Sequence, residues 1–491
     1  MKPIGSRLIL SEPQQEQNAG SSRNLQVMTG KVSRIATPLI VPWVFLLACL
    51  ASGQKVTDSR VASQLEAYLK PFVETGNFTG AVLVARKGRV LFRHAYGMTN
   101  YELQVPNSPA TRFHIASVSK PFTAIAILQL EEQGRLSVSD PVARFIPDFP
   151  NGDRIKLEHL LTHTSGIHNV NDLPDYDTFA RSPHTVEQLV AKFSNLPLDF
   201  EPGSDYHYSN SNYNLLALIL EKVSGESYGD YVRKHILDPA GMQNTGHNGE
   251  ALRLIPLAAS GYEPAGINSY EKAPYLDWSN KTGNGSLYST VDDLYRFDRA
   301  LSTDALLKPA TRQKYFAEGR GNRFGWFNRK RGARRVMSSN GRSPGFTAQL
   351  DRFPDDDVTV IVLSNSYATV SQDPIAGGLA AIVFGKQPEK TPALRAAAIP
   401  PSTLASCAGQ YQYGPDYFIP NATFTLSIDG GTLLLELGSF RTPLVPLSAT
   451  EFLERNFMGR VLFSLGAGGK VDGMIYRYAG KDFVAHRMEA K

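Results

Sequence analysis

A serine and a lysine stand three residues apart at the start of a strongly apolar segment. The pair is Ser117 and Lys120, and residues 121–130 that follow have the apolar density of a buried helix. Residues three apart on a helix share one face. A neighbouring base can turn a serine hydroxyl into a nucleophile, and a lysine can be that base if burial keeps its amine neutral. The segment therefore predicts a helix that begins with a hydroxyl beside a desolvated amine.

The Ser-x-x-Lys spacing alone has a simpler interpretation, because it occurs by chance in many proteins. In that alternative Ser117 caps a helix and Lys120 is solvated. The surrounding sequence favours the catalytic interpretation, since four more motifs follow in order. They are Leu-Glu-His-Leu-Leu-Thr-His-Thr-Ser-Gly-Ile at 157–167, Glu-Pro-Gly at 201–203, Tyr-Ser-Asn at 208–210 and Pro-Gly-Phe at 344–346.

These motifs, in this order across residues 78–365, resemble the serine beta-lactamase and penicillin-binding-protein superfamily. The closest resemblance is to its class C-like branch of beta-lactamases, D-alanyl-D-alanine peptidases, esterases and related amide hydrolases. The resemblance implies that Ser117 is the nucleophile, Lys120 its proton-transfer partner and Tyr208 the phenol of the second motif. Asn210 would hold the substrate amide and the lysine. We expect a nearby ammonium to favour the Tyr208 phenolate, so either Lys120 or Tyr208 could be the working base.

The third motif departs from the family pattern. Relatives carry Lys-Thr-Gly or His-x-Gly before the Pro-Gly-Phe segment, whereas this chain has Ser339, Asn340 and Gly341. A hydroxyl thus replaces the group that would bind a substrate carboxylate. Gly341 is kept, and the backbone N–H of Arg342 would form the oxyanion hole together with that of Ser117. The change puts carboxylate recognition in doubt and leaves the acylation machinery intact.

Two other segments invite catalytic interpretations that we do not favour. Lys281-Thr282-Gly283 matches the missing third motif, but nothing strand-like precedes it and the Pro-Gly-Phe segment lies far downstream. His159 and His163 are one helical turn apart and could bind a metal, yet no glutamate follows His159 as hydrolytic zinc motifs require. We interpret these histidines as structural, and the sequence predicts no metal and no cofactor.

Composition is that of an ordinary globular protein. The chain has 491 residues, of which 42% are hydrophobic and 20% charged, and a net charge of +5. This net positive charge is too small and too dispersed to predict nucleic acid as a partner. We interpret the basic run at 328–335 as a solvated hairpin tip. The predicted partner is a small-molecule or peptide substrate, and the sequence does not indicate the oligomeric state.

The N-terminal segment predicts export. Residues 39–51 are apolar apart from Pro42, follow basic residues and end in small ones, which is typical of a signal peptide cleaved before Gln54. This run is shorter than the roughly 20 residues that span a bilayer. Met28 would then be the true start. We expect a periplasmic or secreted protein, attached to a membrane only if Cys49 is lipidated, and Cys407 would have no intrachain partner.

The remaining pattern predicts two folded domains. Residues 1–53 form the extension and signal peptide, 57–385 the hydrolase domain, 386–402 a linker and 403–491 a C-terminal domain. Periodicity alone predicts only a mixed α and β class. It indicates a hairpin at 81–93, helices over 120–237 and strands at 346–353 and 358–363. The resemblance implies an α/β (α+β) fold with an antiparallel sheet, flanking helices and an inserted all-helical lobe.

The C-terminal domain contains short strand patterns separated by glycine-rich turns. These patterns fall at residues 409–411, 424–428, 432–437 and 460–464. Their position and spacing look like the small lipocalin-like β-barrel that is often appended to such hydrolases.

The sequence thus predicts an exported serine hydrolase with a Ser117 acyl-enzyme. Its substrate would be a small ester, a D-amino-acid peptide or a β-lactam, with efficient β-lactam hydrolysis the less favoured because of Ser339. The alternative is a binding or scaffolding protein that keeps the penicillin-recognising fold without turnover. The joint presence of Ser117, Lys120, Tyr208 and Asn210 argues against that alternative.

Overall fold

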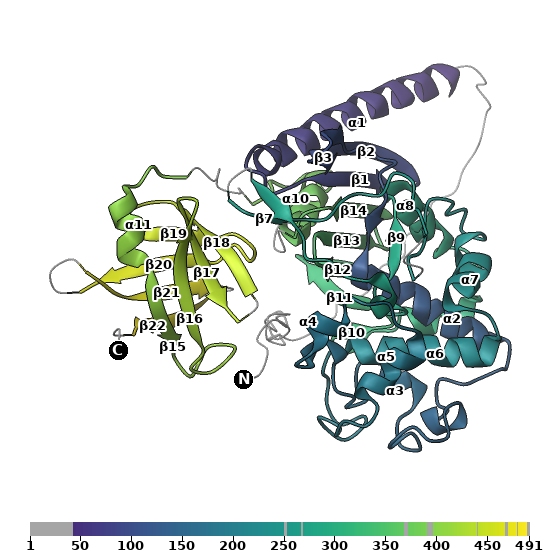
Figure 1. Cartoon of the computed structure of the whole chain (residues 1–491). Helices are drawn as coiled ribbons and strands as arrows, with labels where there is room; N and C mark the ends of the chain where they lie inside the picture. The colour runs from purple at the N-terminus through teal and green to yellow at the C-terminus, as the bar shows by residue number, and fades with distance from the viewer. Residues whose placement is uncertain are drawn as a thin grey trace, which may run out of the picture.

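The computed structural model describes residues 43–249, 253–266, 269–367, 372–389, 396–438, 440–466, 470–478 and 480–488, with side chains from Asp58 onward. Figure 1 shows a larger body, in which helices surround a sheet, and a separate small β-barrel. The predicted fold class is confirmed: an antiparallel sheet with flanking helices and a helical lobe, followed by a closed barrel.

The central sheet has seven strands in the order β10-β11-β12-β13-β14-β1-β2, and all neighbours are antiparallel. In this sheet β1, the first strand along the chain, pairs with β14, the last, and Gly80 lies opposite Ser364. Lys87 and Gly88 form the turn of the predicted hairpin, both with positive φ, as a two-residue hairpin turn requires. The strands are β1 (Gly80–Arg86), β2 (Arg89–Tyr96), β10 (Asn322–Arg323), β11 (Trp326–Arg331), β12 (Arg334–Ser343), β13 (Phe346–Phe353) and β14 (Val358–Ser364).

Helices cover both faces of this sheet, which explains why β1 is apolar on both sides. On one face, α1 (Trp43–Glu74) and α10 (Gln372–Val383) pack against Val82 and Val84. On the other, α8 (Val291–Ala300) packs against β1, and Ala81 and Leu83 belong to the same hydrophobic core as residues of α2 (Lys120–Glu132). Figure 1 shows this layered arrangement.

The helical lobe follows α2 and is built around α6 (Asn210–Ser224). This helix begins three residues before the apolar pattern that starts at Tyr213, so Asn210, Ser211 and Asn212 are buried with it. It ends at Gly225, whose φ of 76° is the left-handed cap that favours glycine. The other helices are α3 (Leu157–Leu161), α4 (Tyr176–Phe179), α5 (Val186–Phe193), α7 (Tyr228–Val232) and α9 (Pro309–Tyr315), with short helical turns η2 (Val142–Arg144), η3 (Val170–Asp172) and η4 (Arg233–Leu237).

Three small sheets join the loops around the lobe. The sheet β5-β9-β6 brings residue 114 next to residue 288. It therefore holds the segment before Ser117 against the segment after Asn284. The strands are β3 (Met98–Asn100), β4 (Val105–Pro106), β5 (Phe113–His114), β6 (Gly246–His247), β7 (Tyr262–Pro264), β8 (Tyr270–Lys272) and β9 (Leu287–Ser289).

The C-terminal barrel is closed, and its strands neighbour one another in chain order from β15 to β22. This is the up-and-down arrangement of lipocalin-type barrels. Four of its strands coincide with the predicted ones, and β18, β19, β21 and β22 were not predicted. The elements are α11 (Pro401–Cys407), β15 (Gly409–Tyr413), β16 (Thr423–Asp429), β17 (Thr432–Leu437), β18 (Phe440–Pro446), β19 (Glu451–Glu454), β20 (Arg460–Leu465), β21 (Val471–Tyr478) and β22 (Lys481–Arg487).

One buried arginine joins the barrel to the larger body. Arg455, directly after β19, is 1% exposed. Its guanidinium donates to the carbonyl of Gly76 at 2.7 Å, to that of Gly266 at 3.2 Å and to the side chain of Asn77. Gly76 and Asn77 lie between α1 and β1, and Gly266 lies directly after β7. The barrel therefore contacts the larger body through specific hydrogen bonds.

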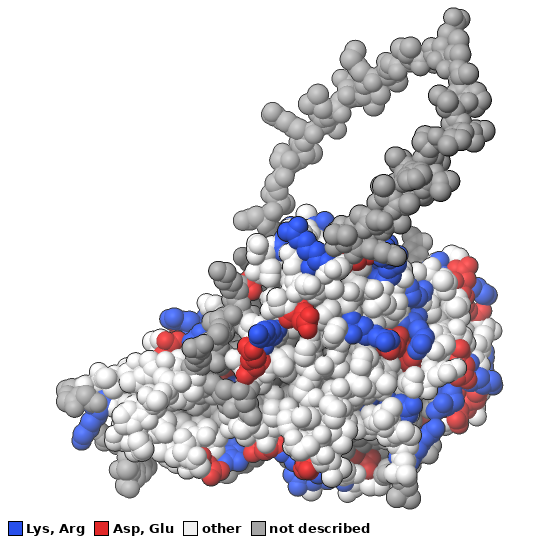
Figure 2. Space-filling model, turned by 90° about the horizontal axis from the view of Figure 1, so that it is seen from above, with Lys and Arg blue, Asp and Glu red and all other residues white. Residues whose placement is uncertain are grey.

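The N-terminal predictions fall mainly outside the described part. Residues 39–42 are not described, nor is the side chain of Cys49, and the backbone of α1 runs without a break through Gln54. Among the described residues, no helix is long and apolar enough to cross a membrane. Cys407 is buried and is a free thiol. On the face shown in Figure 2, basic and acidic side chains are interspersed.

Candidate active site

Ser117 lies on a tight turn that the fold holds from both sides. The turn is η1 (Ala116–Ser119), between β5 and the first residue of α2. Ala116 has φ 46°, in the left-handed region that is uncommon for residues other than glycine. The N–H of Ile115 donates to the carbonyl of Leu287 at 3.0 Å, which fixes the entry to the turn. Ser117 itself is partly exposed while its neighbours are buried, so its hydroxyl is presented to a ligand.

Lys120 is the first residue of α2 and is completely buried. Its Nζ lies 3.0 Å from Ser117 Oγ, 2.8 Å from Asn210 Oδ1 and 2.9 Å from the carbonyl oxygen of Asn284. Three fixed partners leave the amine one orientation. The predicted hydroxyl and amine are therefore side by side, and Asn210 holds the lysine as expected.

Burial also sets the protonation of this lysine. Loss of hydration lowers the pKa of Lys120 well below its ordinary value, and the positive charge of Lys281 lowers it further. Both causes favour the neutral amine, which is the form that can accept a proton. The sequence-based expectation of a desolvated lysine is confirmed.

Tyr208 approaches Ser117 from the other side. Its hydroxyl donates to Ser117 Oγ at 3.0 Å, and Lys120 Nζ lies 4.9 Å from the centre of its ring. Burial raises the pKa of Tyr208 above its ordinary value. The predicted phenolate is therefore wrong, because the neighbouring lysine is itself desolvated and offers little positive charge to stabilise it. Tyr208 keeps its proton and acts as a donor in this site.

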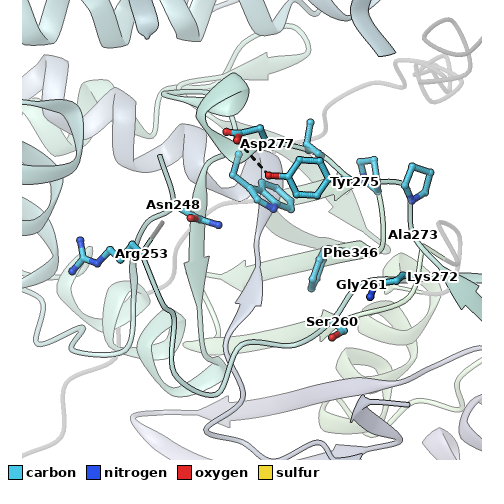
Figure 3. Close-up of a pocket in the computed structure, with 13 residues that line it drawn as sticks. Asn248, Arg253, Ser260, Gly261, Lys272, Ala273, Tyr275, Asp277 and Phe346 are labelled. Atoms are coloured by element: carbon cyan, nitrogen blue, oxygen red, sulfur yellow. Dashed lines mark hydrogen bonds between the residues drawn. The ribbon is translucent and has the colours of Figure 1, made fainter. Parts of the chain in front are cut away.

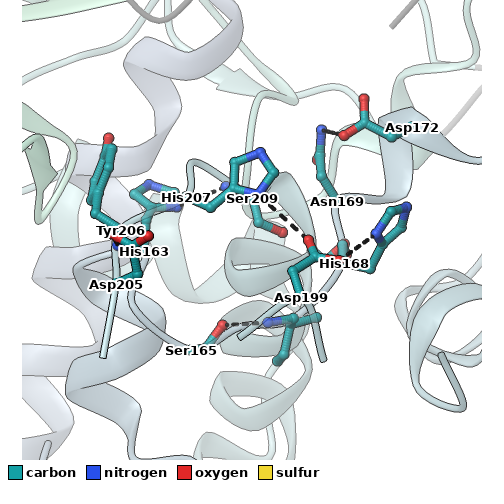
Figure 4. Close-up of polar contacts among 12 residues, drawn as sticks. His163, Ser165, His168, Asn169, Asp172, Asp199, Asp205, Tyr206, His207 and Ser209 are labelled. Atoms are coloured by element: carbon teal, nitrogen blue, oxygen red, sulfur yellow. Dashed lines mark hydrogen bonds and ion pairs between the residues drawn. The ribbon is translucent and has the colours of Figure 1, made fainter. Parts of the chain in front are cut away.

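Polar contacts around His163 and Ser209 fix the second motif (Figure 4). The carbonyl of His163 accepts from the N–H of His207 at 3.0 Å, and His163 Nδ1 accepts from the N–H of Ser209 at 3.2 Å. The His163 ring also stacks on Tyr208, with centroids 4.3 Å apart. Burial lowers the pKa of His163, so the ring is neutral and can accept. His163 thus positions Tyr208.

The first residue of α6 is held in the same way. The N–H of Asn210 donates to Asn169 Oδ1 at 2.9 Å, and its Nδ2 donates to Asn171 Oδ1 at 2.8 Å. The orientation of the Asn210 amide leaves Oδ1 for Lys120. Neither Asn169 nor Asn171 was predicted, because no local pattern marks an asparagine whose partner lies about 40 residues away in the chain.

The two histidines of the 159/163 pair each have a contact within the protein. His159 Nδ1 accepts from the N–H of Lys156 at 3.3 Å, and His163 serves Tyr208. His168 and His207 instead share Asp199, at 2.9 and 3.4 Å. No group of three or more potential metal ligands occurs among the described side chains.

The third motif lies on β12, directly against the Ser117 turn. A Cβ added to Gly341 would come within 2.1 Å of the carbonyl oxygen of Ile115 and 3.0 Å of the nitrogen of Ser117, so only glycine fits. Ser339 shares this face of the strand, because side chains alternate, and Arg342 is on the opposite face. Ser339 is fully buried, and its Oγ has no hydrogen-bond partner among the described residues.

Lys281-Thr282-Gly283 is not a strand, as the sequence context indicated. Lys281 ends the helical turn η5 (Trp278–Lys281), and the loop after it packs on α2, where the carbonyl of Gly283 accepts from Thr123 Oγ1 at 2.6 Å. The loop supplies the Asn284 carbonyl that holds Lys120. Sequence reasoning missed this contact because a backbone acceptor leaves no residue-type signal.

A cavity of about 290 Å³ opens beside the site, with an aromatic wall (Figure 3). Trp278 and Phe346 line it, and the ring of His114 stacks on Trp278 with centroids 3.6 Å apart. His114 stands three residues before Ser117. None of Ser117, Lys120 and Tyr208 lines the cavity, so it adjoins the reactive residues without containing them.

Comparison with known proteins agrees with this geometry. The family described as Beta-lactamase matches residues 65–383. Penicillin-binding protein 4* of Bacillus subtilis is 32% identical over 446 residues, which cover 84% of this chain and 96% of that protein. A D-stereospecific amidohydrolase from Streptomyces sp. is similar with a TM-score of 0.55 and 25% identity, covering 62% of this chain and 94% of that one.

One solved structure extends over both parts of the molecule. The octameric penicillin-binding protein homologue from Pyrococcus abyssi has a TM-score of 0.59 and 24% identity to this chain. It covers 86% of this chain and 99% of its own. This similarity concerns the fold.

Proposed function

Because this chain belongs to the beta-lactamase family and is a serine hydrolase of that kind, we propose that it cleaves an ester or amide through a Ser117 acyl-enzyme. One observation carries the proposal. Ser117 Oγ lies 3.0 Å from Lys120 Nζ and 3.0 Å from the Tyr208 hydroxyl. A single partly exposed hydroxyl is thus in contact with a desolvated amine and a protonated phenol.

In the proposed acylation, Lys120 is the base. Its neutral amine takes the proton of Ser117 while Oγ forms a bond to the carbonyl carbon of the substrate. The resulting oxyanion is held by the backbone N–H groups of Ser117 and Arg342. The bond to the leaving group then breaks. Tyr208 gives that group its proton, and the proton held by Lys120 restores the phenol.

Deacylation again uses Lys120 as the base. Lys120 takes a proton from water as the water oxygen bonds to the acyl carbon. The bond from that carbon to Ser117 Oγ breaks, and Oγ takes the proton from Lys120, which returns the amine to its neutral form. Assigning the base to Lys120 is supported by the opposite pKa shifts of the two candidates: burial lowers the pKa of Lys120 and raises that of Tyr208.

The proposed substrates are small esters, D-amino-acid peptides or amides, and β-lactams. Similarity to a penicillin-binding protein and to a D-stereospecific amidohydrolase supports this range. Of these substrates, β-lactams are the least favoured for efficient hydrolysis, because Ser339 stands where relatives carry a cation or imidazole. We also propose that the protein is exported, from the apolar segment at 39–51; N-terminal sequencing of the mature protein tests a cut before Gln54.

Covalent labelling tests the nucleophile. A fluorophosphonate probe and a fluorescent penicillin should each add one adduct to the wild type, seen by intact-protein mass spectrometry, and none to Ser117→Ala. Ser119→Ala is the matched control, because Ser119 is fully buried and its Oγ accepts from the N–H of Leu287 at 3.1 Å. Labelling that survives in Ser117→Ala contradicts the assignment, and an unlabelled wild type supports the non-catalytic alternative.

A further inference from the structure

A second buried lysine beside the active site has no partner. Lys281 is 6% exposed. Buried ammonium groups are ordinarily paired with a carboxylate, because an isolated charge loses its hydration. Within the described part of the chain, no hydrogen bond or ion pair reaches Lys281 Nζ; its recorded contact is with the ring of Tyr176, 5.0 Å away. Among the described residues Lys281 thus has no anionic partner, and its Nζ is not one of the fully buried unpartnered atoms, so it stays accessible to a ligand.

The backbone places this lysine next to the reactive groups. The carbonyl of Lys281 accepts from the N–H groups of Asn284 at 3.0 Å and Gly285 at 2.7 Å, and the carbonyl of Asn284 holds Lys120. A Cβ built on Gly285 would lie 3.5 Å from Lys281 Cβ and 3.4 Å from the carbonyl carbon of Ala116. The Lys281 side chain thus starts alongside the Ser117 turn. Its charge is also close enough to lower the pKa of Lys120.

The opposite wall comes from the segment that contains α4. Asn280 Nδ2 donates to the carbonyls of Ala180 at 3.1 Å and Ser182 at 2.8 Å, so η5 is fixed against the end of that segment. Tyr176, over which Lys281 lies, has a buried hydroxyl without a partner among the described residues. An ammonium and a phenol, both without acceptors, therefore lie together between η5 and α4.

This cation lies on a different side of Ser117 from the third motif. Gly341 and Ser339 approach from β12, whereas Lys281 faces Tyr176 on the segment whose Asn171 orients Asn210. Asn210 is the residue expected to hold the substrate amide. An anion at Lys281 would lie on the Asn210 side of the substrate, which we assign to its acyl part.

We propose that Lys281, with the hydroxyl of Tyr176, binds a free carboxylate on the acyl portion of the substrate. The inference rests on the proposed acyl-enzyme at Ser117 and narrows its substrate class to acidic acyl groups. It explains how this chain can lack a cation at Ser339 and still recognise an anion, at another position. A charge-assisted hydrogen bond in a dry site gives both affinity and selectivity.

The test uses two anilides that differ in one group. They are N-glutaryl-D-phenylalanine 4-nitroanilide and its analogue in which the glutaryl carboxylate is a primary amide. Wild type should have the higher kcat/KM for the acid. When each variant is assayed at a pH on the plateau of its own profile, where Lys120 is neutral, Lys281→Met should lower kcat/KM for the acid about 10- to 100-fold and change it for the amide by less than about threefold, as expected for one charged hydrogen bond. Lys281→Arg should keep the preference.

Lys192→Met is the matched control. Lys192 also lies over an aromatic ring, at 4.6 Å from Phe179, but pairs with Asp175 at 3.8 Å. This variant should leave both substrates unchanged. The rate of fluorophosphonate labelling, with a neutral probe, is measured on every variant and reports the proposed nucleophile independently of the carboxylate.

Three results would overturn the proposal: no preference for the acid in wild type, equal losses on both substrates in Lys281→Met with normal labelling, or an equal loss in Lys192→Met. Absence of labelling in wild type would instead contradict the acyl-enzyme itself. If Lys281→Met does not fold, a protection experiment on the wild type tests the proposal. The acidic anilide should slow fluorophosphonate labelling at a lower concentration than its amide analogue does. Equal protection by the two would contradict a carboxylate site.

Discussion

Each of the two domains contains a buried ionisable group, and the two groups differ in what they contact. Lys120 of the hydrolase body is 0% exposed and Glu454 of the barrel is 1% exposed. Burial is the largest effect on both: it lowers the pKa of Lys120 and raises that of Glu454, so each neutral form is favoured. The difference lies in their partners. Lys120 contacts the partly exposed hydroxyl of Ser117, whereas Glu454 contacts only groups of the barrel.

Glu454 shows what a structural buried carboxyl looks like. It accepts from the N–H of Asn456 at 2.6 Å and that of Phe457 at 2.7 Å, and Thr442 also donates to it. These bonds shape the turn that presents Arg455 to the hydrolase body. Burial and a shifted pKa are thus common to both sites, and contact with a partly exposed hydroxyl, the proposed nucleophile, distinguishes the Lys120 site.

The largest effects should come from breaking the proton-transfer unit. Lys120→Ala and Tyr208→Phe should each lower kcat by about 10²- to 10⁴-fold, since both serve the same proton. The double variant should be little worse than the worse single one, because groups that act as a unit are not additive. Steady-state kinetics on an ester and an anilide measure this. Near wild-type turnover in Tyr208→Phe on both substrates would make the phenol structural.

Adding one methyl group to β12 should have the next largest effect. In Gly341→Ala the new Cβ would lie 2.1 Å from the carbonyl oxygen of Ile115 and must move the Ser117 turn, so acylation should fall about 100-fold or more. Gly377→Ala is the control, because its added methyl meets the guanidinium of Arg331 and not the Ser117 turn. Labelling rates compare the two variants. An equal effect would show that the contact with the turn is unimportant.

The pH dependence should identify Lys120 as the base. Protonation removes the base, so kcat/KM for a neutral ester should rise as pH increases through the lowered pKa of Lys120 and then level off. Lys281→Met removes a positive charge that lowers this pKa, so the rise should move to higher pH. Lys192→Met should not move it. A shift to lower pH in Lys281→Met would contradict this electrostatic assignment.

The smallest effect on chemistry should come from the barrel. Glu454→Ala removes an acceptor shared by two backbone N–H groups, so the free energy of unfolding of the barrel should fall by about 1–3 kcal/mol. Calorimetry and denaturant unfolding measure that loss. Fluorophosphonate labelling at low temperature should be unchanged. A large loss of labelling in a folded Glu454→Ala protein would mean that the barrel takes part in acylation.

The sequence predicted the residues whose surroundings are local. Ser117 and Lys120 are one turn apart, and Lys87 with Gly88 forms a two-residue turn, so nearby residues define both. Asn284 could not be predicted, because it acts through a backbone carbonyl on a lysine 164 residues away. The protonation of Tyr208 was predicted wrongly for the same reason, since burial depends on packing that the local sequence does not contain.

The barrel was predicted only in part, for a related reason. The predicted strands are apolar and bounded by glycine turns, whereas β18 (Phe440–Pro446) contains two prolines and an arginine, which local propensity disfavours. It is a strand because it pairs with β17 and β19 on its two sides. Closure of the barrel, a property of all eight strands, decides this assignment.

The pairing of β1 with β14 has a consequence for how the protein is made. Synthesis runs from the N-terminus, so the hairpin of β1 and β2 leaves the ribosome long before β14, whose Ser364 must lie opposite Gly80. The contacts of Ser117 and Lys120 likewise form only after Tyr208, Asn284 and Gly341 have been synthesised. A fold with such distant contacts assembles late and slowly. A nascent or truncated chain that ends before β14 should therefore be unable to react with an acylating probe.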